Sequence, residues 1–121
     1  MTARQKWAVR CLIVLAMLTG VSPAGATPNP VMRLAPSVRA TFTCIIWHES
    51  RSTWTHFNLT DNSRWGSSGI FQIIPLMWSA YGVPLGIRVP VWRASIYEQE
   101  RVAVNIWRHD GFVPWQGDGC V

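Results

Sequence analysis

The chain has 121 residues, which is enough for one domain and too few for two. Charged residues make up 14% of the composition and the formal net charge is +5. No run of lysine and arginine and no nucleic-acid motif accompanies that charge, so composition excludes nucleic acid as the expected partner.

Residues 1–26 have the three parts of an export signal. A positively charged start is followed by an apolar run over 11–20, and a small-x-small cleavage site ends at Ala26. The apolar run is shorter than the roughly 18–20 residues that span a bilayer. We expect cleavage after Ala26, a secreted or cell-envelope location (extracellular or periplasmic), and no stable membrane insertion afterwards. Beyond Ala26, eight arginines and six acidic residues give a charge of +2, which suits an anionic cell wall.

Two cysteines, Cys44 and Cys120, remain beyond the cleavage site. An exported chain folds in an oxidising compartment, so we expect them to form one disulfide that holds an irregular tail over 112–121. Closing so long a loop contributes roughly 4 kcal/mol of stability. Neither the cysteines nor the histidines have the spacing of metal ligands, so we expect no metal and no cofactor.

The first half of the exported chain predicts a linker, a helix and a turn. Residues 27–37 hold three prolines and predict a linker. The apolar periodicity over 38–50 predicts a helix with Ser37 as its N-cap. Two glycines in 66–74 predict a tight turn followed by a short irregular or β-like stretch.

The second half predicts two further helices. Pro75 begins a short helix over 75–81, and the proline-rich stretch over 83–93 predicts a loop. Ser95 and Glu98 have the spacing of a capping box at the start of the last helix. Gly111 is a suitable residue to end that helix.

Glu49 carries the strongest chemical signal. The apolar residues of the helix over 38–50 form one stripe at 100° per residue, and Glu49 falls inside this stripe near the helix C-terminus. Burial and the helix dipole both disfavour the charged carboxylate and raise its pKa. A carboxylic acid that keeps its proton near neutral pH can protonate a glycosidic oxygen. A buried glutamate paired with Arg39 or Arg101 fits the same pattern equally well.

Three stretches carry a resemblance to a known family. Residues 44–50 (CIIWHES), then 66–75 (GSSGIFQIIP), then a tryptophan-containing tail that ends at Cys120 resemble the lysozyme-like superfamily. The chain is similar there to lytic transglycosylases and to the small transglycosylase-like domains of secreted actinobacterial proteins, over about residues 40–121. The resemblance implies a mainly α (α+β lysozyme-like) single domain over 38–121, with a short β-like segment that lines a cleft.

The resemblance also implies roles for particular residues. Glu49 would be the catalytic acid, and Ser50 would help fix the cleft wall. Gly69, Phe71 and Gln72 would line the sugar site. Core packing explains Phe71 at least as well, and Gln72 has the alternative of bonding backbone groups in the turn.

The activity implied is cleavage of the β-1,4 bond between N-acetylmuramic acid and N-acetylglucosamine in peptidoglycan glycan strands, by a monomer. In the lytic transglycosylases one acid suffices, because the C6 hydroxyl of the muramic acid attacks C1 and leaves a 1,6-anhydro sugar. Hydrolysis of the same bond stays open, with Asp61 as the candidate second carboxylate, although a turn-forming role for Asp61 is simpler. A non-catalytic peptidoglycan-binding or resuscitation-type domain stays open as well.

Overall fold

The computed structural model describes residues 29–59 and 66–121. The predicted export signal and Asp61 lie outside these residues. The elements, in chain order, are η1 (Pro30–Arg33), α2 (Pro36–Ser50), α3 (Pro75–Gly82), η2 (Val83–Leu85), η3 (Val91–Arg93), α4 (Ile96–Asp110) and η4 (Val113–Asp118). The chain is mainly helical, as predicted, and the described residues form β-structure only as two isolated bridges, Thr53 with His56 and Ser68 with Ile73. Over the described residues, no helix combines the length and the hydropathy that crossing a membrane requires.

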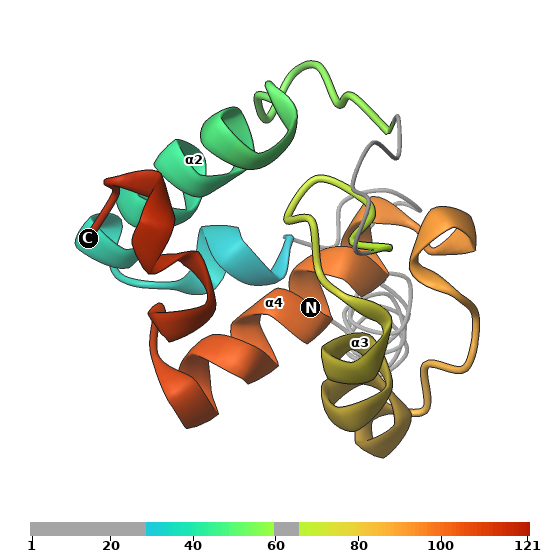
Figure 1. The fold of residues 1–121 in the computed structure, drawn as a ribbon. Helices are drawn as coiled ribbons and strands as arrows, with labels where there is room; N and C mark the ends of the chain where they lie inside the picture. The colour runs from blue at the N-terminus through green and yellow to red at the C-terminus, as the bar shows by residue number, and fades with distance from the viewer. Residues whose placement is uncertain (1–28, 60–65) are drawn as a thin grey trace, which may run out of the picture.

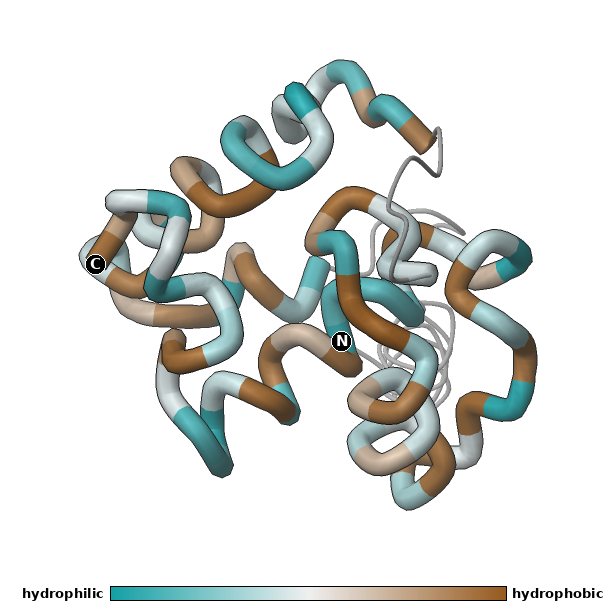
Figure 2. The backbone as a smooth tube through the Cα atoms, in the orientation of Figure 1, coloured by the Kyte–Doolittle hydropathy of each residue, from teal (hydrophilic) through white to brown (hydrophobic). Residues whose placement is uncertain are grey.

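The helices enclose one hydrophobic core. In Figure 1, η1 lies between α2 and α4, and α3 packs beside α4. Figure 2 shows hydrophobic positions recurring along α2 and α4 and through the segment over 66–74. Side chains from all of these segments are fully buried, among them Val31, Phe42, Ile46, Ile70, Val102 and Ile106. Because the segment over 66–74 contributes core residues, its position relative to α2 is set by packing.

The start and end of α4 follow the prediction. The Ser95 hydroxyl accepts a hydrogen bond from the Glu98 backbone N–H (3.1 Å), and the Glu98 carboxylate accepts one from the Ser95 backbone N–H (3.0 Å). This reciprocal pair is the predicted capping box. Gly111 ends the helix with a φ of 63°, a value that glycine adopts without steric cost.

The start of α2 differs from the prediction. The helix begins at Pro36, with Ala35 as N-cap and no side-chain cap, and so Ser37 lies inside the first turn. Proline at the first helical position has a fixed φ and lacks an N–H that would be unpaired there, which explains the earlier start. The predicted loop over 83–93 also contains more structure than expected, since η2 and η3 both lie within it.

Part of the predicted linker belongs to the domain. Residues 30–33 form η1, and Val31 is fully buried against the core. The Val31 backbone N–H donates a hydrogen bond to Oε1 of Glu100 in α4 (3.2 Å). Proline content alone suggested a loose segment, but one buried side chain and one long-range hydrogen bond anchor it.

Burying the carboxyl group of Glu100 in this contact costs folding free energy. Its side chain is fully buried, and its second carboxyl oxygen, Oε2, has no hydrogen-bond partner among the described residues. Burial raises the pKa of Glu100 from 4.5 to about 7, although the hydrogen bond from Val31 opposes the rise. The folded chain therefore holds this proton more tightly than the unfolded chain does between pH 4.5 and 7.

We expect Glu100→Gln to remove a pH-dependent loss of stability. The proton on Glu100 stabilises the folded state fully below pH 4.5, and this stabilisation is lost as the pH rises to about 7. Glutamine stays neutral throughout, so the variant should gain roughly 3 kcal/mol over the wild type between pH 4.5 and pH 8. Urea unfolding of both proteins at these two pH values measures the gain. A difference between the two proteins that does not change with pH would show that Glu100 ionises normally.

Candidate active site

Glu49 lies in the last turn of α2 and is half-buried. Burial of the carboxyl group raises the pKa of Glu49 from 4.5 to about 8, and a hydrogen bond to Asp118 and repulsion from the Asp118 charge add to the rise. Glu49 therefore keeps its proton at neutral pH, as the sequence pattern predicted. Its neighbour is another carboxyl group, and no arginine contributes to the shift.

Asp118 is the site residue that sequence reasoning missed. It ends η4, 69 positions after Glu49, and η4 packs against α2. The disulfide between Cys44 and Cys120, with a Cα–Cα distance of 5.7 Å, confirms the predicted pairing and brings the tail onto α2 (Figure 1). The predicted disulfide was the one signal that could have found Asp118, because Cys120 is two residues beyond it and Cys44 is five residues before Glu49.

The carboxyl group of Asp118 lies close enough to Glu49 to affect its ionisation. Two carboxyl groups can hydrogen-bond only when one of them is protonated, and protonated Glu49 can donate to the Asp118 carboxylate. Oδ2 of Asp118 is buried and has no hydrogen-bond partner among the described residues. A buried acceptor without a donor is costly, and a proton on the neighbouring Glu49 would reduce that cost.

Ser50 connects α2 to the segment over 66–74. Its hydroxyl lies 3.0 Å from the Ile46 carbonyl oxygen, 3.0 Å from the Ile70 carbonyl oxygen and 2.7 Å from the Ser52 hydroxyl. The Ile70 contact crosses 20 positions of sequence and places that segment next to the residue that follows Glu49. Ser50 therefore links the end of α2 to the segment over 66–74.

Glycine is required at position 69 because of its backbone conformation and because Gln99 leaves no space for a side chain. Its φ is +77°, and a Cβ atom there would overlap Oε1 of Gln99. That oxygen accepts a hydrogen bond from the Ile70 backbone N–H (2.9 Å), and the Gln99 amide donates to the Ala94 carbonyl (3.2 Å). The predicted tight turn therefore exists, and Gln99 of α4 holds it in place.

Phe71 and Gln72 have structural contacts that explain them. Phe71 is 1% exposed, and its ring packs edge-on against Phe42 with centroids 5.8 Å apart. Gln72 has a φ of 48°, donates to the Gly69 carbonyl (2.9 Å) and accepts from the Ser67 hydroxyl (3.2 Å). Of the four residues expected in substrate binding, only Gln72 is partly exposed, while Ser50, Gly69 and Phe71 are buried.

Trp47 offers an aromatic surface close to Glu49 in the sequence. It is 47% exposed on α2, and the Arg51 guanidinium group lies 5.3 Å from its ring centre. Exposed tryptophan rings stack well on flat ligands, including sugar rings. Arg51 takes the left-handed conformation that ends α2, with a φ of 57°, and so the helix end holds this cation beside the ring.

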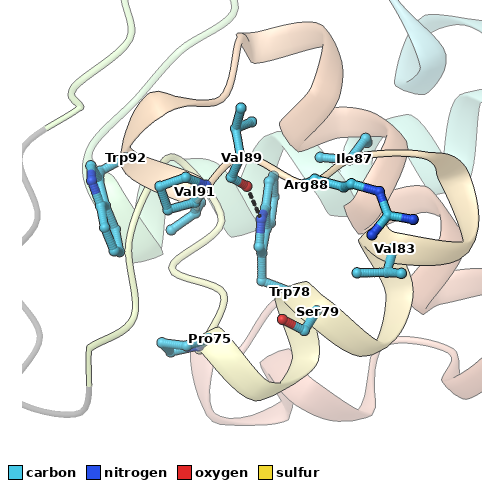
Figure 3. Close-up of a pocket in the computed structure, with 10 residues that line it drawn as sticks. Pro75, Trp78, Ser79, Val83, Ile87, Arg88, Val89, Val91 and Trp92 are labelled. Carbon is cyan, nitrogen blue, oxygen red and sulfur yellow. Dashed lines mark hydrogen bonds between the residues drawn. The ribbon is translucent and has the colours of Figure 1, made fainter.

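Three cavities among the described residues have linings that do not include Glu49. One of them, of about 270 Å³, lies between α3 and the loop that follows it, with Trp78 at its centre and the 66%-exposed Trp92 at its edge (Figure 3). Another, of about 160 Å³, is lined by Gln72 and Trp115.

His48 is close to the disulfide. Its ring nitrogen and the sulfur atoms of Cys44 and Cys120 lie within 4.8 Å of one another. Cysteine binds metals as a thiolate, and the disulfide leaves no thiolate at this position. While the disulfide is formed, neither cysteine can bind a metal as a thiolate.

Comparisons with protein-family models, with curated proteins and with solved structures found no match for the chain. The kind of site is therefore inferred from the chemistry of its residues alone. A carboxylic acid that keeps its proton to about pH 8, next to an ionisable partner at the surface, is suited to general acid catalysis.

Proposed function

We propose that the protein cleaves the β-1,4 glycosidic bond between N-acetylmuramic acid and N-acetylglucosamine in peptidoglycan, without water, to give 1,6-anhydro products. The observation that carries the proposal is the Glu49 carboxyl group, which burial and Asp118 keep protonated to about pH 8. The resemblance of residues 44–50 and 66–75 to lytic transglycosylases supplies the substrate and the reaction. Export through the predicted signal would deliver the enzyme to the cell wall.

The proposed reaction needs one acid. Protonated Glu49 gives its proton to the glycosidic oxygen as the bond from that oxygen to C1 of the muramic acid breaks. The C6 hydroxyl of the same sugar attacks C1 and passes its proton to the Glu49 carboxylate. Glu49 ends the cycle protonated, and no external nucleophile is consumed.

Asp118 fits this scheme as the group that sets the pKa of Glu49. Hydrolases that use two carboxyl groups separate them by about 5–5.5 Å for retention or about 6.5–9.5 Å for inversion. Asp118 raises the pKa of Glu49, and this role requires no second carboxylate at either hydrolase spacing.

We expect Asp118→Asn to move the alkaline limb of the pH–rate profile to lower pH. The substitution removes the negative charge that raises the pKa of Glu49 and leaves burial as the remaining cause. The acid form of Glu49 would then be lost at a lower pH than in the wild type. Rates of peptidoglycan solubilisation between pH 5 and pH 9 measure the shift. The matched control is Asp110→Asn, which removes an exposed carboxylate that bonds Tyr81, and an equal shift in both variants would contradict the role of Asp118.

Mass spectrometry of the fragments released from purified peptidoglycan tests the reaction itself. The proposal predicts 1,6-anhydro muropeptides that disappear with Glu49→Gln. Reducing-end products that depend on Glu49 would identify a hydrolase instead. The wild type could instead bind peptidoglycan and release no fragments at any pH or from any wall source. That result would favour the hypothesis of a non-catalytic wall-binding domain.

A further inference from the structure

A polar cavity of about 220 Å³ lies between α4, η1 and η2. Three arginines line it, Arg33, Arg101 and Arg108, together with Tyr97 and Asn105. We call it the arginine cavity. It shares no lining residue with the Glu49 site.

The arginines of the cavity come from two elements. Tyr97, Arg101, Asn105 and Arg108 follow one another on α4 at steps of four, four and three residues, the spacing that places side chains on one face of a helix. Arg33 comes from η1, which docks on α4. The docking of η1 therefore brings a third positive charge to a helix face that already has two.

Two of the polar side chains in the cavity are held by contacts. The Arg101 guanidinium carbon lies 6.0 Å from the Tyr97 ring centre, and its Nη2 donates to the Leu85 carbonyl (3.5 Å). The Asn105 amide donates to the Tyr81 carbonyl (2.9 Å). Such contacts reduce the entropy that a ligand must remove on binding.

In the described part of the chain, no acidic side chain neutralises the charge of these arginines. No carboxylate there forms an ion pair with any of the three. The acidic residues of α4 have other contacts: Glu98 bonds Ser95 in the capping box, Glu100 bonds the Val31 amide, and Asp110 bonds the Tyr81 hydroxyl. Three like charges around one cavity repel one another, and a bound anion would relieve that repulsion.

We propose that the arginine cavity binds the phosphate group of a phosphate ester. A single guanidinium group can satisfy both oxygens of a carboxylate with its two-pronged donor face. A phosphate group has more oxygens and more charge than one arginine can match, and so it suits three arginines around one cavity. The cavity is also small, below the roughly 300–1,000 Å³ of sites for drug-sized ligands. The proposal goes beyond peptidoglycan cleavage and holds whether or not Glu49 is catalytic.

Titration of the purified protein with inorganic phosphate, followed by NMR at constant ionic strength, tests the proposal. We expect saturable shifts at Arg33, Arg101 and Arg108, and little response to acetate at the same concentration. Linear polyphosphate is the second probe. Tighter binding of polyphosphate than of phosphate would identify a polymeric source of the phosphate group, and equal binding per phosphate would identify a small phosphate ester.

The variant Arg33→Gln/Arg108→Gln measures the contribution of the cavity. Both residues are exposed, so the fold should tolerate the change, and losing two charge-assisted hydrogen-bond donors should weaken phosphate binding at least about tenfold. The control Arg88→Gln/Arg93→Gln removes the same charge from exposed positions elsewhere and should change binding less than about twofold. Equal weakening in both variants, acetate binding as tight as phosphate binding, or no saturable shift in the wild type would each overturn the proposal.

Discussion

We expect Glu49→Gln to lower the rate of the proposed peptidoglycan cleavage by about 10²–10⁴-fold, the range that a positioned general acid contributes. Glutamine has the shape of protonated glutamate, and its amide can still donate to Asp118, but it has no proton to give to a leaving oxygen. The loss should therefore appear in the rate of the chemical step and leave binding to intact peptidoglycan unchanged. Release of soluble fragments under saturating substrate measures the rate.

The unfolding free energy of Glu49→Gln shows whether the variant is inactive because it lacks the acid or because its fold is damaged. The folded-state pKa of Glu49 is raised to about 8, so the wild type loses stability as the pH rises from 4.5 to 8, and glutamine removes that loss. Glu49→Gln should then unfold at a higher urea concentration than the wild type at pH 8 while being inactive. An inactive variant that is also less stable at pH 8 would show that Glu49 has a structural role in place of a catalytic one.

Removing the disulfide with Cys44→Ser/Cys120→Ser costs roughly 4 kcal/mol of unfolding free energy, from the loop-entropy model. The disulfide closes a sequence separation of 76 residues, nearly the whole domain, so the unfolded chain gains much freedom without it. Urea unfolding of residues 27–121 near neutral pH measures the loss. The reduced wild type is the matched control, because it keeps both cysteines and should lose about as much stability as the serine variant.

The same variant also tests how the site is assembled. Cys120 holds the tail that carries Asp118 against α2. Without this link Asp118 should contact Glu49 less often, so the pKa of Glu49 should fall and the alkaline limb of the pH–rate profile should move to lower pH. An unfolding midpoint equal to that of the oxidised wild type would contradict the stabilising role. An unchanged pH profile would show that packing of η4 alone positions Asp118.

Local signals in the sequence predicted much of the fold. The capping box at Ser95 and the helix end at Gly111 were read correctly, because short hydrogen-bonding patterns determine them. The disulfide was predicted from two cysteines that follow a predicted export signal. The burial of Glu49 followed from its place in an apolar stripe of α2.

Features that depend on contacts between distant residues were not predicted. The docking of η1 relies on a hydrogen bond between Val31 and Glu100 across 69 positions, and no local pattern indicates it. Asp118 reaches Glu49 through the fold of the whole tail, and its own surroundings, two glycines, look like a turn. Phe71 has the same sequence signature whether it lines a ligand site or packs in the core, and only its 1% exposure distinguishes them.

The proposed catalytic role of Glu49 requires its carboxyl group to be protonated at neutral pH, and a carbon-13 NMR titration of that group measures its pKa. Selective labelling of glutamate, with Glu49→Gln to assign the signal, gives the midpoint in the folded wild type. We predict a midpoint near pH 8, as burial and Asp118 require, and a lower midpoint in Asp118→Asn. A wild-type midpoint near 4.5, the ordinary value for glutamate, would mean that Glu49 is ionised at neutral pH, and it would contradict its role as the catalytic acid.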